Sequence, residues 1–114
     1  MCLWVWGWQL DRAIRQYVWE RYHVRLRRRE ATAVRKRIGT AYPPVHETAT
    51  VVGGVILTSE EVRAVYRRQL YPLLDRILKQ KPRRVRVCGA RLAGIDLLIR
   101  DECSVDWCIP RIDL

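Results

Sequence analysis

The chain has 114 residues, of which 49% are hydrophobic and 30% are charged, and it carries 22 basic against 12 acidic side chains for a net charge of +10. This length and apolar fraction suit one domain with a packed core, and they exclude both a disordered chain and a small scaffold that depends on disulfides. We therefore expect residues 1–114 to form a single, strongly basic domain.

The N-terminal segment predicts a short strand followed by an amphipathic helix. Leu3–Trp6 is rich in residues that favour strands, and Gly7 interrupts it. Apolar residues at helical spacing then predict a helix from Gln9 to about Val24. The tryptophan-rich start suits a strand that is buried or faces a partner, and a membrane-surface anchor is the alternative, because Trp favours the bilayer interface.

A second, shorter helix is expected from Glu30 to Ile38. The basic run Arg25–Arg29 interrupts the apolar pattern before this helix, and Gly39 provides a C-terminal stop. The prolines at 43 and 44 cannot continue a helix, so they indicate an extended connector.

The middle of the chain predicts a β-hairpin followed by a long helix. Two glycines at 53 and 54 separate the apolar runs of Thr48–Leu57, which favours a tight turn within an inserted hairpin spanning residues 45–57. Thr58 and Glu61 form the pattern of a capping box, so we expect a helix to begin here and to extend to Lys79. Pro72 predicts a kink in it.

The last third of the sequence predicts two strands with an ambiguous segment between them. Val85 and Val87 alternate with arginines, which is typical of a strand over Arg83–Val87 with one buried face. Ser104–Ile109 is the final strand candidate, whereas Ile95–Arg100 suits a helix or a strand equally well.

The four cysteines do not have the spacing of a zinc site. Free thiols are the favoured interpretation, and a disulfide between Cys103 and Cys108 is the alternative.

In this order the motifs resemble those of MreB, the bacterial actin-like rod-shape family. The helix that carries Asp11, Ala13, Ile14 and Tyr17 is similar to the family's D-x-A-I-x-x-Y helix. Three further segments resemble the family's I-K-x-x-I-G-S-A-Y-P, S-S-E-E-V and T-G-G-G-A-L-L-x-G-L-D motifs, and these are Arg35–Pro43, Thr58–Val62 and Val87–Asp96.

The resemblance implies an α/β fold, namely a partial actin-like (ribonuclease H-like) lobe with a small inserted β-hairpin, and it makes Ile95–Arg100 a short helix. It implies a cytoskeletal, cell-shape protein that acts by protein–protein association. The expected partner is the chain itself or a full-length actin-like protein, in the cytoplasm or at the inner face of the membrane.

The resemblance also assigns positions that face the nucleotide in the family, and these are Arg35, Gly89, Ala90, Arg91 and Gly94. Both Gly-rich phosphate hairpins of the family lie upstream of the part that this chain matches. Thr32 and Ala33 stand where the family has acidic residues, and the glycine triplet of the adenosine loop has become Cys88-Gly89-Ala90. Because phosphoryl transfer depends on positioning and a metal ion, we expect no ATP hydrolysis. Binding of ATP is the one cofactor interaction that the resemblance leaves open.

The family's lobe is built on a sheet whose first strands are absent here, which predicts an unpaired sheet edge. Arg84 and Arg86 fit that expectation, because a strand covered on both faces would not carry them. The tryptophan-rich start, another copy or a partner would fill the edge, so we expect association rather than a free monomer.

A basic nucleic-acid-binding module is the alternative function. Arginine pairs well with phosphate oxygens, and a chain of this charge attracts polyanions, including an anionic membrane surface. The candidate residues are Arg25, Arg27, Arg28, Arg29, Arg35, Lys36, Arg37, Arg83, Arg84 and Arg86.

An enzyme is the least supported class of function. Carboxylates such as Glu47, Asp75 and Asp106 occur singly, and Cys88 lacks a base in the sequence that would activate it. His46 is interpreted as a loop residue. We therefore expect neither a catalytic nor a metal site.

Overall fold

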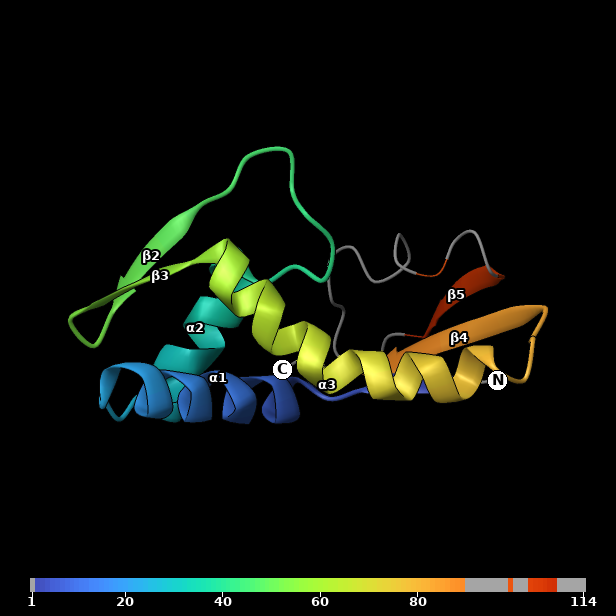
Figure 1. Ribbon diagram of the computed structural model, residues 1–114, viewed down its shortest axis with the longest axis horizontal. Helices are drawn as coiled ribbons and strands as arrows, with labels where there is room; N and C mark the ends of the chain where they lie inside the picture. The colour runs from blue at the N-terminus through green and yellow to red at the C-terminus, as the bar shows by residue number, and fades with distance from the viewer. Residues whose placement is uncertain (1, 90–98, 100–102, 109–114) are drawn as a thin grey trace.

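The computed structural model describes residues 2–89, 99 and 103–108. Figure 1 shows helices between a sheet at one end of the molecule and a hairpin at the other. In chain order the elements are β1 (Cys2–Val5), α1 (Gly7–Tyr22), α2 (Arg28–Ile38), β2 (Ala49–Val52), β3 (Val55–Thr58), α3 (Ser59–Leu78), β4 (Arg84–Gly89) and β5 (Ser104–Cys108). The expected α/β class is confirmed.

The three-stranded sheet has the order β1-β4-β5, and both pairings are parallel. Leu3 and Val5 of β1 lie in register with Val87 and Gly89 of β4. Since parallel strands need a long crossover, helices α1 to α3 and the hairpin fill the connection between β1 and β4.

The tryptophan-rich start pairs with β4, so the expected role of this segment as a strand is confirmed. The sheet edge that the sequence predicts is filled by the tryptophan-rich start, one of the three expected occupants, and this pairing makes β4 the central strand of the three. The side chains of Arg84 and Arg86 are exposed, while those of Val85 and Val87, which alternate with them, are buried. The arginines therefore mark the uncovered face of the strand and not its edge.

The first two helices begin earlier than the periodicity predicts. Helix α1 starts at Gly7 and stops before His23, which adopts a left-handed conformation with φ of 57° and cannot extend the helix. Helix α2 starts at Arg28 because the Glu30 carboxylate accepts a hydrogen bond from the Arg27 backbone N–H at 2.9 Å. Arg28 and Arg29, which the sequence places before the second helix, thus belong to the first turn of α2.

Strands β2 and β3 form the expected hairpin. Gly53 and Gly54 both have positive φ angles, 56° and 78°, as a two-residue type I′ turn requires. The paired strands cover residues 49–58, so residues 45–48 of the expected insertion precede the first strand.

Helix α3 begins with the predicted capping box, in which Thr58 Oγ1 accepts a hydrogen bond from the Glu61 N–H at 3.1 Å. The helix continues through Pro72 to Leu78. It bends along its length, as Figure 1 shows, which agrees with a proline inside the helix.

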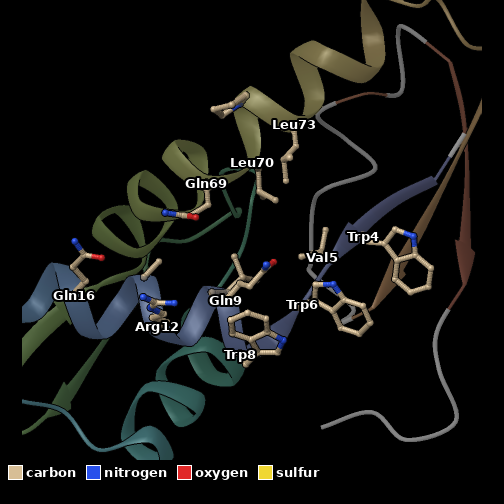
Figure 2. A pocket seen from close by; sticks show the side chains of 13 residues that line it. Trp4, Val5, Trp6, Trp8, Gln9, Arg12, Gln16, Gln69, Leu70 and Leu73 are labelled. Atoms are coloured by element: carbon tan, nitrogen blue, oxygen red, sulfur yellow. The ribbon is translucent and has the colours of Figure 1, made fainter.

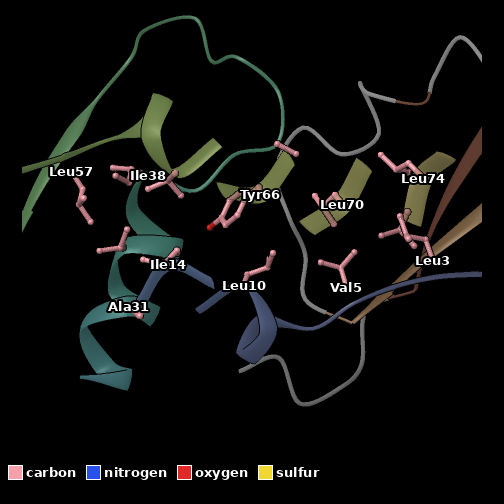
Figure 3. Packing of buried hydrophobic residues seen from close by; sticks show 14 of the residues in the cluster. Leu3, Val5, Leu10, Ile14, Ala31, Ile38, Leu57, Tyr66, Leu70 and Leu74 are labelled. Atoms are coloured by element: carbon pink, nitrogen blue, oxygen red, sulfur yellow. The ribbon is translucent and has the colours of Figure 1, made fainter. Parts of the chain in front are cut away.

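One hydrophobic core connects the sheet with the helices (Figure 3). Leu3 and Val5 contribute from the sheet, Leu10 and Ile14 come from α1, and Tyr66 of α3 lies fully buried between them. The further large members are Val18, Leu26, Val34, Ile38, Leu57, Val62, Leu70, Leu74, Val85, Val87 and Ile99. The helices and the sheet therefore form one folding unit in the described part of the chain.

Cys2 and Cys103 carry free thiols, in agreement with the favoured interpretation of the cysteines. The helix expected at Ile95–Arg100 lies outside the described residues, apart from the buried side chain of Ile99. Within the described residues, no helix is both long enough and apolar enough to cross a bilayer.

Candidate functional site

Arg35, a predicted nucleotide-facing and polyanion-binding residue, lies buried between α1 and α2. Its Nε donates a hydrogen bond to Asp11 Oδ1 at 2.7 Å, and both side chains are almost completely enclosed. Thr32 donates a second hydrogen bond to the other Asp11 oxygen at 2.7 Å. The Arg35 guanidinium also packs so closely on Gly7 that a Cβ there would lie 2.9 Å from it. Arg35 therefore joins the two helices and was wrongly assigned to an exposed polyanion site.

Gly89, the second predicted nucleotide-facing residue, is buried at the end of β4. Its φ is 98°, and a Cβ on it would overlap the carbonyl group of Val5. The close approach of strand β1 thus explains why glycine is needed here. Ala90, Arg91 and Gly94 lie outside the described residues.

The other predicted polyanion-binding residues are exposed, but they do not form one cluster. Arg83, Arg84 and Arg86 belong to the β4 end of the molecule, and the Arg84 Nε lies 3.2 Å from the Asp106 carboxylate. Arg25, Arg27, Arg28, Arg29, Lys36 and Arg37 lie in and around α2, at the other end of the molecule.

Of the carboxylates considered for catalysis, Glu47 and Asp106 have structural partners. Glu47 accepts hydrogen bonds from Ser59 Oγ and from Arg63 Nη1, the latter at 2.8 Å, which ties the connector to the start of α3. The hydrogen bond from Ser59, followed by the Arg63 guanidinium, lowers the pKa of the Glu47 carboxyl against the effect of burial. Among the described residues, no group of three His, Cys, Asp or Glu side chains could hold a metal ion.

A tryptophan surface lies where β1 passes into α1. Trp4, Trp6 and Trp8 are 50%, 40% and 57% exposed, and the first two stack with ring centroids 5.1 Å apart. The three rings border a hollow of about 440 Å³ between α1 and α3, whose opposite wall includes Leu70 and Leu73 (Figure 2). Among the described residues, no carboxylate lines this hollow. Such an open, aromatic hollow is typical of a site for another protein.

A second hollow, of about 380 Å³, adjoins the first along α1 and shares Arg12 and Gln16 with it. It is lined by Arg12, Arg15, Gln16, Trp19, Arg25 and Leu26. The first four residues have the spacing i, i+3, i+4 and i+7, which places them on one face of the helix. This hollow does not correspond to a run of basic residues in the sequence. Its residues on α1 are instead spread along one exposed stripe of the helix, so a prediction from runs of charge does not include them.

Among solved structures, the chain is similar to two structures of MreB5 of Spiroplasma citri. The structure bound to AMPPNP has 24% sequence identity to this chain and a TM-score of 0.64 over 90% of the chain, and the ADP-bound structure has 24% identity and a TM-score of 0.67 over 90%. The chain has the fold of part of an actin-like MreB lobe. It spans only 38–39% of the length of the MreB5 chains. No protein-family model and no curated protein matches the sequence.

Proposed function

We propose that the chain is an actin-like cytoskeletal protein that acts by associating with other protein chains and does not hydrolyse ATP. Its partner is a second copy or a full-length actin-like protein of the MreB type. The similarity of its fold to MreB5 supports a cytoskeletal function. The chain spans 38–39% of the length of the MreB5 chains, so the function of the whole MreB5 protein is carried over here only as part of the proposal.

The observation that carries this proposal is the tryptophan surface. Trp4, Trp6 and Trp8 are exposed side by side at one hollow. Large aromatic side chains of this kind are enriched in protein interfaces, and burying each one contributes about 2 kcal/mol of hydrophobic stabilisation. The backbone of β1 also lies at an edge of the described sheet, so a partner strand could pair with it.

The proposed lack of hydrolysis is supported by the structural contacts of two residues that were predicted to face the nucleotide. Arg35 is paired with Asp11, and Gly89 packs on Val5, so both residues stabilise the fold. Phosphoryl transfer needs a phosphate cradle and a metal ion held by protein or substrate oxygens.

Size-exclusion chromatography with light-scattering detection tests whether the chain associates and whether the tryptophan surface mediates the association. We expect the unaltered chain to have a mass above the 13.5 kDa of a monomer, and the Trp6→Ser/Trp8→Ser variant to return to the monomer mass. The matched control is Val51→Thr/Ile56→Thr, which removes two exposed apolar side chains from the hairpin. An equal loss of association in both variants would contradict the assignment of the surface.

A phosphate-release assay with ATP and magnesium tests the second half of the proposal. We expect release at the rate of the protein-free blank. Turnover that rises in proportion to the protein concentration and persists through purification would overturn it.

A further inference from the structure

We propose that the second hollow, on the exposed face of α1, binds a short stretch of single-stranded nucleic acid. In this site, called the α1 groove below, Trp19 stacks with a base, and Arg12, Arg15 and Arg25 contact phosphates. The inference does not depend on the proposed association, which uses the tryptophan surface.

The charge of the α1 groove fits an anionic ligand. Its three arginines are exposed, and none of them forms an ion pair with a described carboxylate. No acidic side chain from the described part of the chain lines the groove, although Glu20 lies beside it and accepts a hydrogen bond from Gln16 at 3.1 Å. Within a chain of net charge +10, this leaves three positive charges uncompensated around one hollow.

Two of the three arginines are already held in place by the protein. Arg15 Nε donates a hydrogen bond to the Leu26 carbonyl oxygen at 3.1 Å, which uses one of its five donors. The Arg25 guanidinium lies 4.9 Å from the centre of the Trp19 ring. Because these contacts restrict the side chains before a ligand arrives, less conformational entropy is lost on binding.

The aromatic component distinguishes a nucleic acid from other anions. Trp19 is 44% exposed within the groove and lies edge-on to His23, so part of its ring remains open to a ligand. Sites for single strands combine such stacking surfaces with arginines that follow the backbone. From Arg12 to Trp19 the helix rises by about 10 Å, the length of about three stacked nucleotides.

The shape of the groove favours a strand over a membrane surface. An interfacial helix inserts an apolar face into the bilayer, whereas α1 presents Arg12, Arg15 and Gln16 around a hollow whose lining includes the buried side chain of Leu26. Charge alone also attracts an anionic bilayer, so the vesicle measurement below separates the two ligands.

Fluorescence anisotropy of a labelled oligothymidylate of about a dozen nucleotides tests the proposal, because this probe exceeds the expected site size. We expect Arg12→Gln/Arg15→Gln to weaken binding by about tenfold and to reduce the slope of log K against log salt by about 1.4. The matched control is Lys36→Gln/Arg37→Gln, which removes the same charge from exposed positions on α2. Equal weakening by both variants would show diffuse attraction and would overturn the proposal.

A Trp19→Leu variant tests the stacking component at unchanged charge. We expect at least about fivefold weaker binding of oligothymidylate and no change in the salt slope. Unchanged affinity in this variant, or binding of phosphatidylserine vesicles without binding of oligothymidylate, would overturn the proposal. Circular dichroism confirms that each variant is folded, and the oligomeric mass reports separately on the proposed association.

Discussion

At the scale of single residues, Glu61 joins α1 to the start of α3. One of its carboxylate oxygens accepts hydrogen bonds from the hydroxyl groups of Tyr17 and Tyr22, at 2.7 and 2.6 Å. Burial acts to raise the pKa of Glu61, but the hydrogen bonds from these tyrosines and from Thr58 outweigh it, so the pKa is lowered. Burial and the neighbouring Glu61 raise the pKa of Tyr17 to about 12. The ionised carboxylate is therefore the form that the fold stabilises.

We expect Glu61→Gln to lower the free energy of unfolding by about 1–2 kcal/mol near neutral pH, because charged acceptors form the stronger hydrogen bonds. A lowered folded-state pKa contributes stability above the unfolded-state pKa, and that contribution disappears as pH falls through the folded-state value. Urea unfolding at neutral and acidic pH measures the difference between the variant and the unaltered chain. A difference that does not shrink in acid would contradict this role.

Unlike the hydrogen-bonded carboxylate of Glu61, the hydroxyl group of Tyr66 is buried and has no hydrogen-bond partner among the described residues. Burial raises the pKa of this phenol, so it stays neutral. Removing an unsatisfied buried hydroxyl is neutral or favourable. We expect thermal unfolding of Tyr66→Phe to show unchanged or higher stability, by up to about 1 kcal/mol. A clear loss of stability would mean that the hydroxyl has a partner.

At the scale of elements, the pairing of β1 with β4 depends on Gly89. An alanine there would overlap the Val5 carbonyl group as well as adopt a strained φ of 98°. We expect Gly89→Ala to cost about 3 kcal/mol or more, measured by urea unfolding. Gly54→Ala is the matched control, because Gly54 has a φ of 78° with open space around it. This substitution therefore lowers the free energy of unfolding only through backbone strain, by about 1 kcal/mol. Equal costs would show that the contact with Val5 is unimportant.

The elements were largely predictable from the sequence, since they rest on local signals. The hairpin follows from two adjacent glycines, and α3 follows from the capping box at Thr58 and Glu61. The start of α2 at Arg28 was missed because Glu30 caps the helix from within its own first turn. The central position of β4 was missed because strand order depends on contacts between segments more than 80 residues apart, which no local pattern contains.

The candidate sites were predicted less well than the elements. Arg35 looked like a surface cation because nothing in its own segment indicates a partner, and its partner Asp11 lies 24 residues earlier. Arg12, Arg15 and Trp19 were not grouped, since they come together with Arg25 only when the chain turns after α1. A hollow lined by a helical stripe and a turn is therefore not visible as a linear run of charge.

At the scale of the whole molecule, net charge and apolar surface act in opposite directions on association. The charge of +10 repels a second copy, whereas the tryptophan surface favours burial against one. Added salt screens the repulsion, so we expect self-association to strengthen as salt rises while nucleic-acid binding weakens. Light scattering and anisotropy at matched salt concentrations measure the two trends, and a parallel response of both would contradict the separation of the two surfaces.

Sedimentation velocity tests the central claim most directly. The chain is measured alone and mixed with a full-length MreB protein, each with and without ATP and magnesium at moderate salt. We predict species larger than the 13.5 kDa monomer, present to the same extent with and without nucleotide. Nucleotide-independent association would be contradicted if this chain sedimented as a 13.5 kDa monomer both alone and in the mixture, or if it entered larger species only with ATP.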